Sequence, residues 1–211
     1  VEKSGHMKIT VFGANGKTGL LLVYQALEKG HSVTAFARRA ESMPITHRNL
    51  RIMEGNILDP SQVKEAILGQ DVVMSTLGTR ERKKNSILSD GTANIMKAMK
   101  ECGVKRFICM SSAGVLGNDG GFIFGRIMVP LMLRHIMADK KRQLDLIRES
   151  GLEWVVIRPS FLTDSPKTGK YRISMGPPEF RKVPRADVAD FMLKLMTDKQ
   201  YDGQVPAIAG Y

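Results

Sequence analysis

The chain is poor in the residues that build disulfide frameworks and metal sites. Its two cysteines, Cys102 and Cys109, are too few for a disulfide framework. Free thiols are typical of a reducing compartment, so we expect a cytoplasmic protein. The histidines, among them His31, His47 and His135, are scattered without the spacing of metal ligands, and we expect no metal site.

Long apolar runs and linkers are missing as well. The most apolar stretch, residues 122–137, is interrupted by two arginines, a glycine and a proline, so no segment has the pattern of a membrane span. No signal peptide, internal repeat or Pro/Gly/Ser-rich linker is seen. Residues 1–6 are typical of a cloning remnant before Met7. We therefore expect one domain over residues 7–211.

What the chain has in excess is positive charge. It contains 32 Lys and Arg against 21 Asp and Glu, a net charge of +11. Such a surface attracts nucleic acid, anionic lipid or an anionic small molecule. The densest basic cluster, residues 80–84, is expected in a loop, and no helix-turn-helix, zinc or RNP motif accompanies it. The composition favours an anionic small molecule over nucleic acid or membrane as the partner. We expect the protein to be a monomer or a weak homo-oligomer.

Segments with strand and helix patterns alternate along the chain. Strands are expected at 8–12, 31–37, 49–54, 71–77, 106–110, 154–157 and 205–209, and helices at 17–29, 62–68, 90–102, 144–149 and 187–196. This alternation predicts a Rossmann-like α/β fold, a doubly wound parallel sheet with helices on both faces. Ligands bind such sheets beyond the carboxyl ends of the strands. The loops expected there are 13–19, 38–44, 56–58, 77–84, 111–137 and 158–171.

A glycine triplet joins the first strand to the first helix. Gly13 would allow a sharp turn, Gly16 would let a pyrophosphate approach the backbone, and Gly19 would let the helix pack closely on the strand. The helix N-terminus would then offer N–H groups and partial positive charge to phosphate oxygens. The motif with this context predicts a dinucleotide site, and the alternative is a plain turn.

Two arginines follow the second strand, where NAD-binding proteins place an acidic residue for the ribose 2′-hydroxyl. Arg38 and Arg39 at this point suit a 2′-phosphate, which a carboxylate would repel. The position favours NADP(H) over NAD(H). The alternative is that both arginines only solvate the end of a strand.

Short motifs in a fixed order give the chain a family resemblance from Met7 to the C-terminus. It resembles the NmrA-like, atypical short-chain dehydrogenases through Gly13-Ala14-Asn15-Gly16-Lys17-Thr18-Gly19, Leu77-Gly78-Thr79, Ser111-Ser112-Ala113, Ser150-Gly151-Leu152 and Arg158-Pro159. It is most similar to the branch of biliverdin-IXβ and NADPH flavin reductases, through Gly69-Gln70-Asp71, Leu77-Gly78-Thr79-Arg80, Arg148-Glu149-Ser150-Gly151-Leu152, Thr168-Gly169-x-Tyr171 and Tyr201-Asp202-Gly203.

The resemblance implies NADP(H) as cofactor and gives individual residues a role. The pyrophosphate would be surrounded by Gly13, Asn15, Gly16, Lys17 and Thr18, with Arg38 on the 2′-phosphate. Asn56 and Ile57 would meet the adenine, although the family usually has Asp in place of Asn56. The nicotinamide ribose would be lined by Leu77, Gly78 and Thr79, with Ser112 beside the nicotinamide as the catalytic serine. The carboxamide would be held by Pro159 and the backbone of Phe161 and Leu162.

Two departures from related enzymes bear on the reaction. No tyrosine has a lysine four residues later, so the Tyr-x-x-x-Lys proton donor of ordinary short-chain dehydrogenases is missing. The biliverdin-IXβ reductases have a histidine where this chain has Phe161, which puts turnover of biliverdin in doubt. An apolar ring would suit stacking of a flavin, whose N5 takes hydride directly while solvent supplies the proton.

Residues 114–137 combine glycines with large apolar side chains, and they could form either a substrate lid or a core helix. Arg126 and Arg134 would either bind substrate anions or face solvent. We therefore expect an NADPH-dependent reductase of flavins or similar flat acceptors such as tetrapyrroles or quinones. The alternative is an NADP(H)-sensing regulator without catalysis. A nucleotide-sugar epimerase is less favoured, because it needs the missing Tyr-x-x-x-Lys pair.

Overall fold

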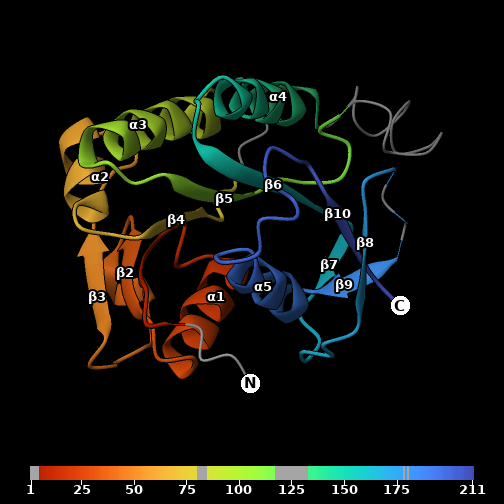
Figure 1. The fold of residues 1–211 in the computed structure, drawn as a ribbon, viewed down its shortest axis with the longest axis horizontal. Helices are drawn as coiled ribbons and strands as arrows, with labels where there is room; N and C mark the ends of the chain where they lie inside the picture. The colour runs from red at the N-terminus through yellow and green to blue at the C-terminus, as the bar shows by residue number, and fades with distance from the viewer. Residues whose placement is uncertain (1–4, 80–84, 117–132, 178, 180) are drawn as a thin grey trace.

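A single large β-sheet runs through the middle of the molecule, with helices packed on both of its faces (Figure 1). This computed structural model describes residues 5–79, 85–116, 133–177, 179 and 181–211. The arrangement confirms the predicted Rossmann-like α/β fold. Within the described part of the chain, no helix combines the length and the apolar character needed to cross a membrane.

The sheet has eight strands in the order β3-β2-β1-β4-β5-β6-β10-β8. They are β1 (Lys8–Phe12), β2 (Ser32–Ala37), β3 (Leu50–Glu54), β4 (Val72–Ser75), β5 (Arg106–Met110), β6 (Glu153–Pro159), β10 (Ala207–Gly210) and β8 (Tyr171–Ser174). All neighbours are parallel except β8, which pairs antiparallel with β10. The order reverses direction between β1 and β4, and this switch point is where open α/β sheets bind ligands.

Two helical layers cover the sheet. On one face α1 (Lys17–Glu28) packs against α5 (Arg185–Lys194). The other face carries α2 (Pro60–Ile67), α3 (Ile87–Cys102) and α4 (Arg134–Arg148), and a short 3-10 turn, η1 (Ala40–Ser42), follows β2. The central strands are apolar on both sides because each side meets a layer of helices, so two hydrophobic cores form.

The predicted helix at 144–149 was too short, because α4 begins ten residues earlier at Arg134. The first half of α4 is mainly polar and shows no apolar stripe, yet it buries Asp139 and Lys140 against the rest of the protein. Likewise, α3 begins at Ile87, three residues before the predicted start. Helix α2 starts at Pro60, two residues before the predicted start, because Asp59 accepts hydrogen bonds from two backbone N–H groups of its first turn.

Three short strands near the C-terminus were not predicted. They are the edge strand β8 and a separate parallel pair formed by β7 (Phe161–Thr163) and β9 (Lys182–Pro184). Each spans three or four residues, too few for a clear alternation of apolar and polar side chains. Their positions place the region after β6 beside α5 rather than in an open loop.

Part of the expected lid falls outside the described residues, namely 117–132 with Arg126, and so does the whole basic cluster at 80–84. Of the remainder of 114–137, residues 114–116 form a turn and Arg134 starts α4.

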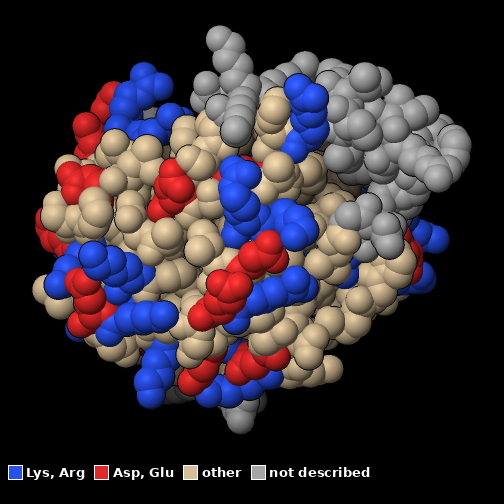
Figure 2. All heavy atoms as spheres, turned by 90° about the horizontal axis from the view of Figure 1, so that it is seen from above, with Lys and Arg blue, Asp and Glu red and all other residues tan. Residues whose placement is uncertain are grey.

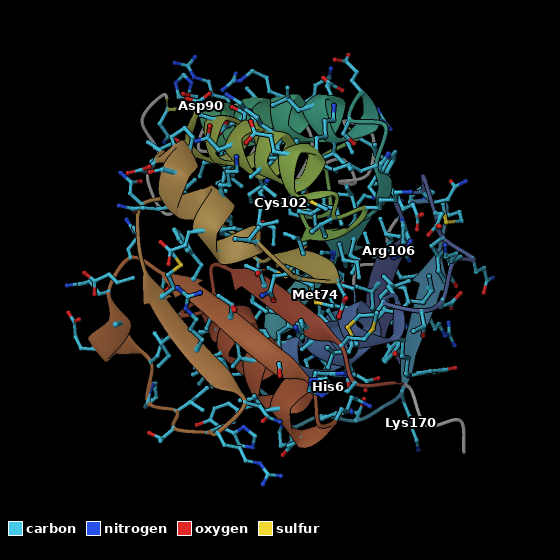
Figure 3. The ribbon with its side chains drawn as sticks, turned by 60° about the vertical axis from the view of Figure 1, so that its left-hand side comes forward. His6, Met74, Asp90, Cys102, Arg106 and Lys170 are labelled. Carbon is cyan, nitrogen blue, oxygen red and sulfur yellow. The ribbon has the colours of Figure 1, made fainter. Side chains whose placement is uncertain are left out.

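A buried arginine fastens the C-terminal region to the sheet. Arg106, labelled in Figure 3, stands at the start of β5 and is 5% exposed. Its guanidinium donates from Nε to the Leu195 carbonyl (3.0 Å) and from Nη2 to the Asp198 carbonyl (2.8 Å), and it forms an ion pair with Asp202. The end of α5 and the turn before β10 are therefore held against the sheet by one side chain.

Candidate functional site: a dinucleotide cleft at the carboxyl ends of the strands

A cleft of about 660 Å³ opens beyond the carboxyl ends of β1, β2, β3 and β4. Its lining comprises Gly13, Asn15, Gly16, Phe36, Ala37, Arg38, Gly55, Asn56, Ile57, Leu58, Thr76, Leu77, Gly78, Thr79, Ile87 and Leu88. These residues come from the end of β2, from the loops after four strands and from the first turn of α3. The cleft therefore lies at the edge and at the switch point where the sequence predicted it.

Nine of the residues predicted to bind cofactor line this cleft together. They are Gly13, Asn15, Gly16, Arg38, Asn56, Ile57, Leu77, Gly78 and Thr79. The other predicted residues lie elsewhere: Lys17 is exposed, Thr18 and Gly19 are buried in α1, Arg39 is exposed, and Ser112, Pro159, Phe161 and Leu162 follow β5 and β6. The remaining lining residues, such as Phe36 and Thr76, were missed because a sequence does not show which strand ends become neighbours.

The glycine loop is shaped by close approach of backbone to backbone. Gly13 has a φ of +77°, which side chains rarely adopt, and so it can turn the chain off β1. A Cβ on Gly19 would overlap the carbonyl oxygen of Gly13 and lie 2.7 Å from the hydroxyl of Thr76. A Cβ on Gly16 would meet only the Gly13 carbonyl, at 3.2 Å. Gly13 and Gly19 are thus required by the fold, whereas Gly16 has little steric need to be glycine within the protein and borders the cleft, as Gly13 also does.

The start of α1 suits an anion. Gly16 is its N-cap, no side chain caps it, and no acidic residue stands in its first turn. The first N–H groups of a helix lack partners inside the helix and carry partial positive charge, so they attract phosphate. This geometry fits the pyrophosphate of a dinucleotide.

Arg38 is the one charged residue among the described residues that line the cleft. It follows β2 directly and is exposed, so its guanidinium is available to a ligand. The next strand end contributes Asn56, whose side-chain oxygen accepts from the Leu58 N–H (3.0 Å) and thereby shapes its own turn. A single cation in a cleft without lining acids favours an anionic ligand at the end of β2.

A second group of predicted residues meets at the ends of β5 and β6. The N–H of Ala113 donates to the carbonyl of Pro159 (3.0 Å), which places the turn containing Ser112 beside the end of β6. The hydroxyl oxygen of Ser112 is buried and has no hydrogen-bond partner among the described residues. Phe161, two residues beyond Pro159, is 50% exposed.

Beneath this turn, α4 contributes buried polar groups that sequence reasoning missed. Burial lowers the pKa of Lys140, although the neighbouring Cys109 and Asp139 act in the opposite direction. Burial also raises the pKa of the Cys109 thiol to about 11, so this cysteine stays protonated and unreactive. The hydroxyl of Ser75, at the end of β4, lies buried in the same layer. The only signal in the sequence was the lysine pair at 140 and 141, which resembles an ordinary solvated helix face.

Asp139 connects α4 to the wall of the cleft. Its carboxylate is 1% exposed and accepts from the N–H groups of Leu88 (3.0 Å) and Ser89 (3.3 Å) and from the Ser89 hydroxyl (2.6 Å). The N-cap residue of α3, Ser86, makes no side-chain capping bond, so a residue of α4 caps α3 instead. Leu88 lines the cleft.

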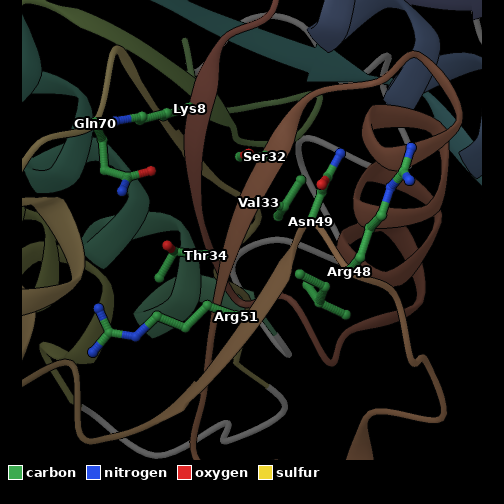
Figure 4. Close-up of a pocket in the computed structure, with 9 residues that line it drawn as sticks. Lys8, Ser32, Val33, Thr34, Arg48, Asn49, Arg51 and Gln70 are labelled. Carbon is green, nitrogen blue, oxygen red and sulfur yellow. The ribbon is translucent and has the colours of Figure 1, made fainter.

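A smaller hollow of about 260 Å³ lies at the opposite edge of the sheet, where β1, β2 and β3 begin. Figure 4 shows the side chains of Arg48 and Arg51 pointing away from each other, and Arg51 forms an ion pair with Glu65 (2.5 Å). Its cations therefore do not converge on one ligand. The face above α3 and α4 likewise carries basic and acidic side chains interspersed rather than one continuous basic area (Figure 2).

A comparison with families of known proteins matches residues 13–199 to a family described as NAD(P)H-binding. The chain belongs to this NAD(P)H-binding family. The match spans the glycine loop, the cleft and α5. It confirms NAD(P)H as the cofactor, and it fits the resemblance to atypical short-chain dehydrogenases. Within the described residues, no group of three or more His, Cys, Asp or Glu side chains could hold a metal ion.

Relatives of this NAD(P)H-binding chain include uncharacterised proteins. An uncharacterised chloroplastic protein of Arabidopsis thaliana is 28% identical over 77% of the chain, and the chain spans 61% of that protein's length. An uncharacterised sugar epimerase of Bacillus subtilis, YhfK, is 26% identical, with 94% of the chain and 92% of YhfK aligned.

Solved structures show the same fold at low sequence identity. A short-chain dehydrogenase/reductase from Veillonella parvula, solved in complex with NADP, has a TM-score of 0.82 at 20% identity over 97% of this chain and 95% of that one. The anaerobilin reductase ChuY from Escherichia coli has a TM-score of 0.78 at 21% identity over 96% and 97%.

The glycine geometry predicts separable effects of two substitutions. Gly16→Val should abolish NADP⁺ binding, because a branched side chain would occupy the approach of the pyrophosphate, while the melting temperature changes little. Gly19→Ala should instead lower the melting temperature, because its Cβ has no space against Gly13. Calorimetric titration and thermal unfolding of both variants check this. Normal NADP⁺ binding by Gly16→Val would show that the loop is only a structural turn.

The buried Lys140 predicts a gain in stability when it is replaced. Its lowered pKa means that the unfolded chain holds this proton more tightly, so stability rises with pH between the folded and the ordinary pKa of lysine. Lys140→Met should therefore raise the melting temperature by a few degrees at pH 7, with a smaller gain at pH 10. Lys141→Met, at an exposed neighbour, is the control. An equal rise in melting temperature at pH 7 and pH 10 would show that Lys140 carries no destabilising buried charge at pH 7.

Proposed function

We propose that the chain is an NADPH-dependent reductase that passes hydride to flavins or to similar flat, conjugated acceptors. The observation that carries this proposal is an exposed aromatic ring, Phe161, at the same sheet edge as a dinucleotide cleft. The sequence has no Tyr-x-x-x-Lys pair to donate a proton to an alcohol or ketone substrate. An acceptor that needs no protein proton donor fits this edge better.

The residues that would hold the cofactor follow from the geometry. Gly16 and the N-terminus of α1 would bind the pyrophosphate, and Arg38 the 2′-phosphate. Asn56 and Ile57 would border the adenine, and the loop 77–79 would line the nicotinamide ribose. The reduced nicotinamide supplies the hydride, and the protein contributes position and exclusion of water. Nothing in this assignment needs a strong protein acid.

The acceptor would lie against the ends of β5 and β6. Phe161 offers a flat apolar surface for stacking, and the buried hydroxyl of Ser112 offers a hydrogen bond that would orient the acceptor or the carboxamide. Pro159 and the backbone at Leu162 would complete this end of the site. Hence Ser112 would act by orientation rather than as an obligate acid.

A second candidate is an NADP(H)-sensing regulator, which the missing Tyr-x-x-x-Lys pair favours equally. An epimerase, the activity in the printed name of the Bacillus relative, is less favoured because that pair is absent. Steady-state oxidation of NADPH with FMN, FAD or a quinone separates enzyme from sensor. Tight NADPH binding without any turnover would support the sensor.

Cofactor preference follows from Arg38. We expect NADPH to bind more tightly than NADH, and Arg38→Ala to cost about 1.5–3 kcal/mol of NADPH binding, the value of a hydrogen bond to a charged group. NADH binding should change little. Affinities of both cofactors are measured in both proteins, with Arg39→Ala, whose residue lies outside the cleft lining, as the matched control. Equal affinity of the wild-type chain for the two cofactors would contradict the assignment.

Acceptor preference follows from Phe161. Flavin reduction should exceed biliverdin reduction, and Phe161→Ala should weaken flavin binding by about 1 kcal/mol, the size of an aromatic stacking contribution. Phe161→His should raise activity toward biliverdin. Ser112→Ala should slow turnover only modestly. The measurement is KM and kcat for each acceptor. Complete loss of activity in Ser112→Ala would instead show that this serine is a required proton donor.

A further inference from the structure

Three separate segments of the chain meet at the carboxylate of Asp164. Lys17, the first residue of α1, forms an ion pair with one carboxylate oxygen, and Arg185, the first residue of α5, donates to the other at 2.5 Å. Asp164 itself directly follows β7. The hydrogen bond from Lys17 holds the pKa of Asp164 below its usual range, so this carboxylate is ionised at neutral pH.

Strand pairing brings these groups together. In the parallel pair of β7 and β9, Thr163 stands opposite Pro184. The next residues of the two strands are Asp164 and Arg185, which therefore emerge side by side. Because α5 packs against α1, the start of α1 with Lys17 lies within reach of both.

The segment after Asp164 is held firmly on α5. Asp187 accepts from the N–H groups of Thr168 (2.9 Å) and Gly169 (2.8 Å), and Lys167 forms an ion pair with Asp190 at 2.6 Å. Both carboxylates are buried. These bonds anchor the segment that follows Asp164 on α5. The side chains of Lys17 and Asp164 are 61% and 58% exposed, so a soluble anion can reach the ammonium of Lys17 and compete for it.

We propose that Asp164 is an internal competitor for the cofactor's pyrophosphate, because it holds the ammonium of Lys17 in the free protein and yields it to the phosphate. Lys17 follows Gly16, which borders the cleft. The ammonium of Lys17 would therefore bind the carboxylate of Asp164 in the free protein and the pyrophosphate in the complex. Arg185, 20% exposed, stays with Asp164 after the exchange and keeps the carboxylate compensated. Asp164 would be a positioning residue that limits cofactor affinity and speeds cofactor release. The inference rests on the proposed cofactor site.

The test is a double-mutant cycle on NADP⁺ affinity, measured by calorimetric titration at low salt. Asp164→Asn should tighten NADP⁺ binding about two- to fivefold, the range that exposed ion pairs support. In the Lys17→Met background, Asp164→Asn should leave the affinity unchanged. Asp164→Glu, which keeps the carboxylate, should bind NADP⁺ like the wild type.

Glu65→Gln is the matched control, since the pair of Arg51 and Glu65 has similar exposure and lies at the far edge of the sheet. A gain in affinity that persists in the Lys17→Met background would show that Asp164 acts only as a repelling charge, and would overturn the inference. So would an Asp164→Asn variant that binds like the wild type, or an equal gain in Glu65→Gln. Absence of NADP⁺ binding in the wild type would refute the cofactor site itself, and the inference with it.

Discussion

The close contact between α1 and the loop after β1 is the constraint on which the cleft depends. The Gly13 carbonyl occupies the space that a Cβ on Gly19 would need, and the Thr76 hydroxyl donates to that same carbonyl at 3.1 Å. This contact fixes the angle at which α1 leaves the sheet and ties it to the end of β4. The helix N-terminus therefore points its unpaired N–H groups toward the switch point of the sheet. Every other feature of the site is arranged around that position.

The charge of the molecule is distributed in a way that its total does not show. A net charge of +11 first indicates a general affinity for anions, yet many described lysines and arginines pair with carboxylates on the surface. The cleft keeps a single cation, Arg38, and no lining acid among the described residues. The paired surface charges attract anions only weakly, because salt and their carboxylate partners screen them. Selectivity for one phosphate group would therefore come from the position of Arg38 in the cleft and not from the net charge.

Much of the fold and the position of the cleft could be predicted from the sequence, because both rest on local patterns. The apolar runs of β1 and β5 set their ends correctly, and the glycine loop with Arg38 located the cleft. The region after β5 and β6 was harder to predict. Strands β7 and β9 are too short to show a period, and the first half of α4 buries polar side chains where an apolar stripe is the usual signal.

The residues that connect distant segments could not be predicted from the sequence alone. Asp164 and Lys17 are separated by most of the chain, and nothing near either of them marks the other as its partner. Lys140 looks like any solvated lysine until α3, α4 and β5 are packed around it. The environment of such residues is set by tertiary contacts, and local sequence patterns do not indicate those contacts.

The cap that Asp139 places on α3 has a consequence for how the protein assembles. The first turn of α3 forms one wall of the cleft, but the group that satisfies its N–H donors belongs to a helix about fifty residues further along the chain. A nascent chain that has not yet added α4 would leave this turn frayed. The wall of the cleft that Leu88 contributes is then completed only after α4 has docked on α3.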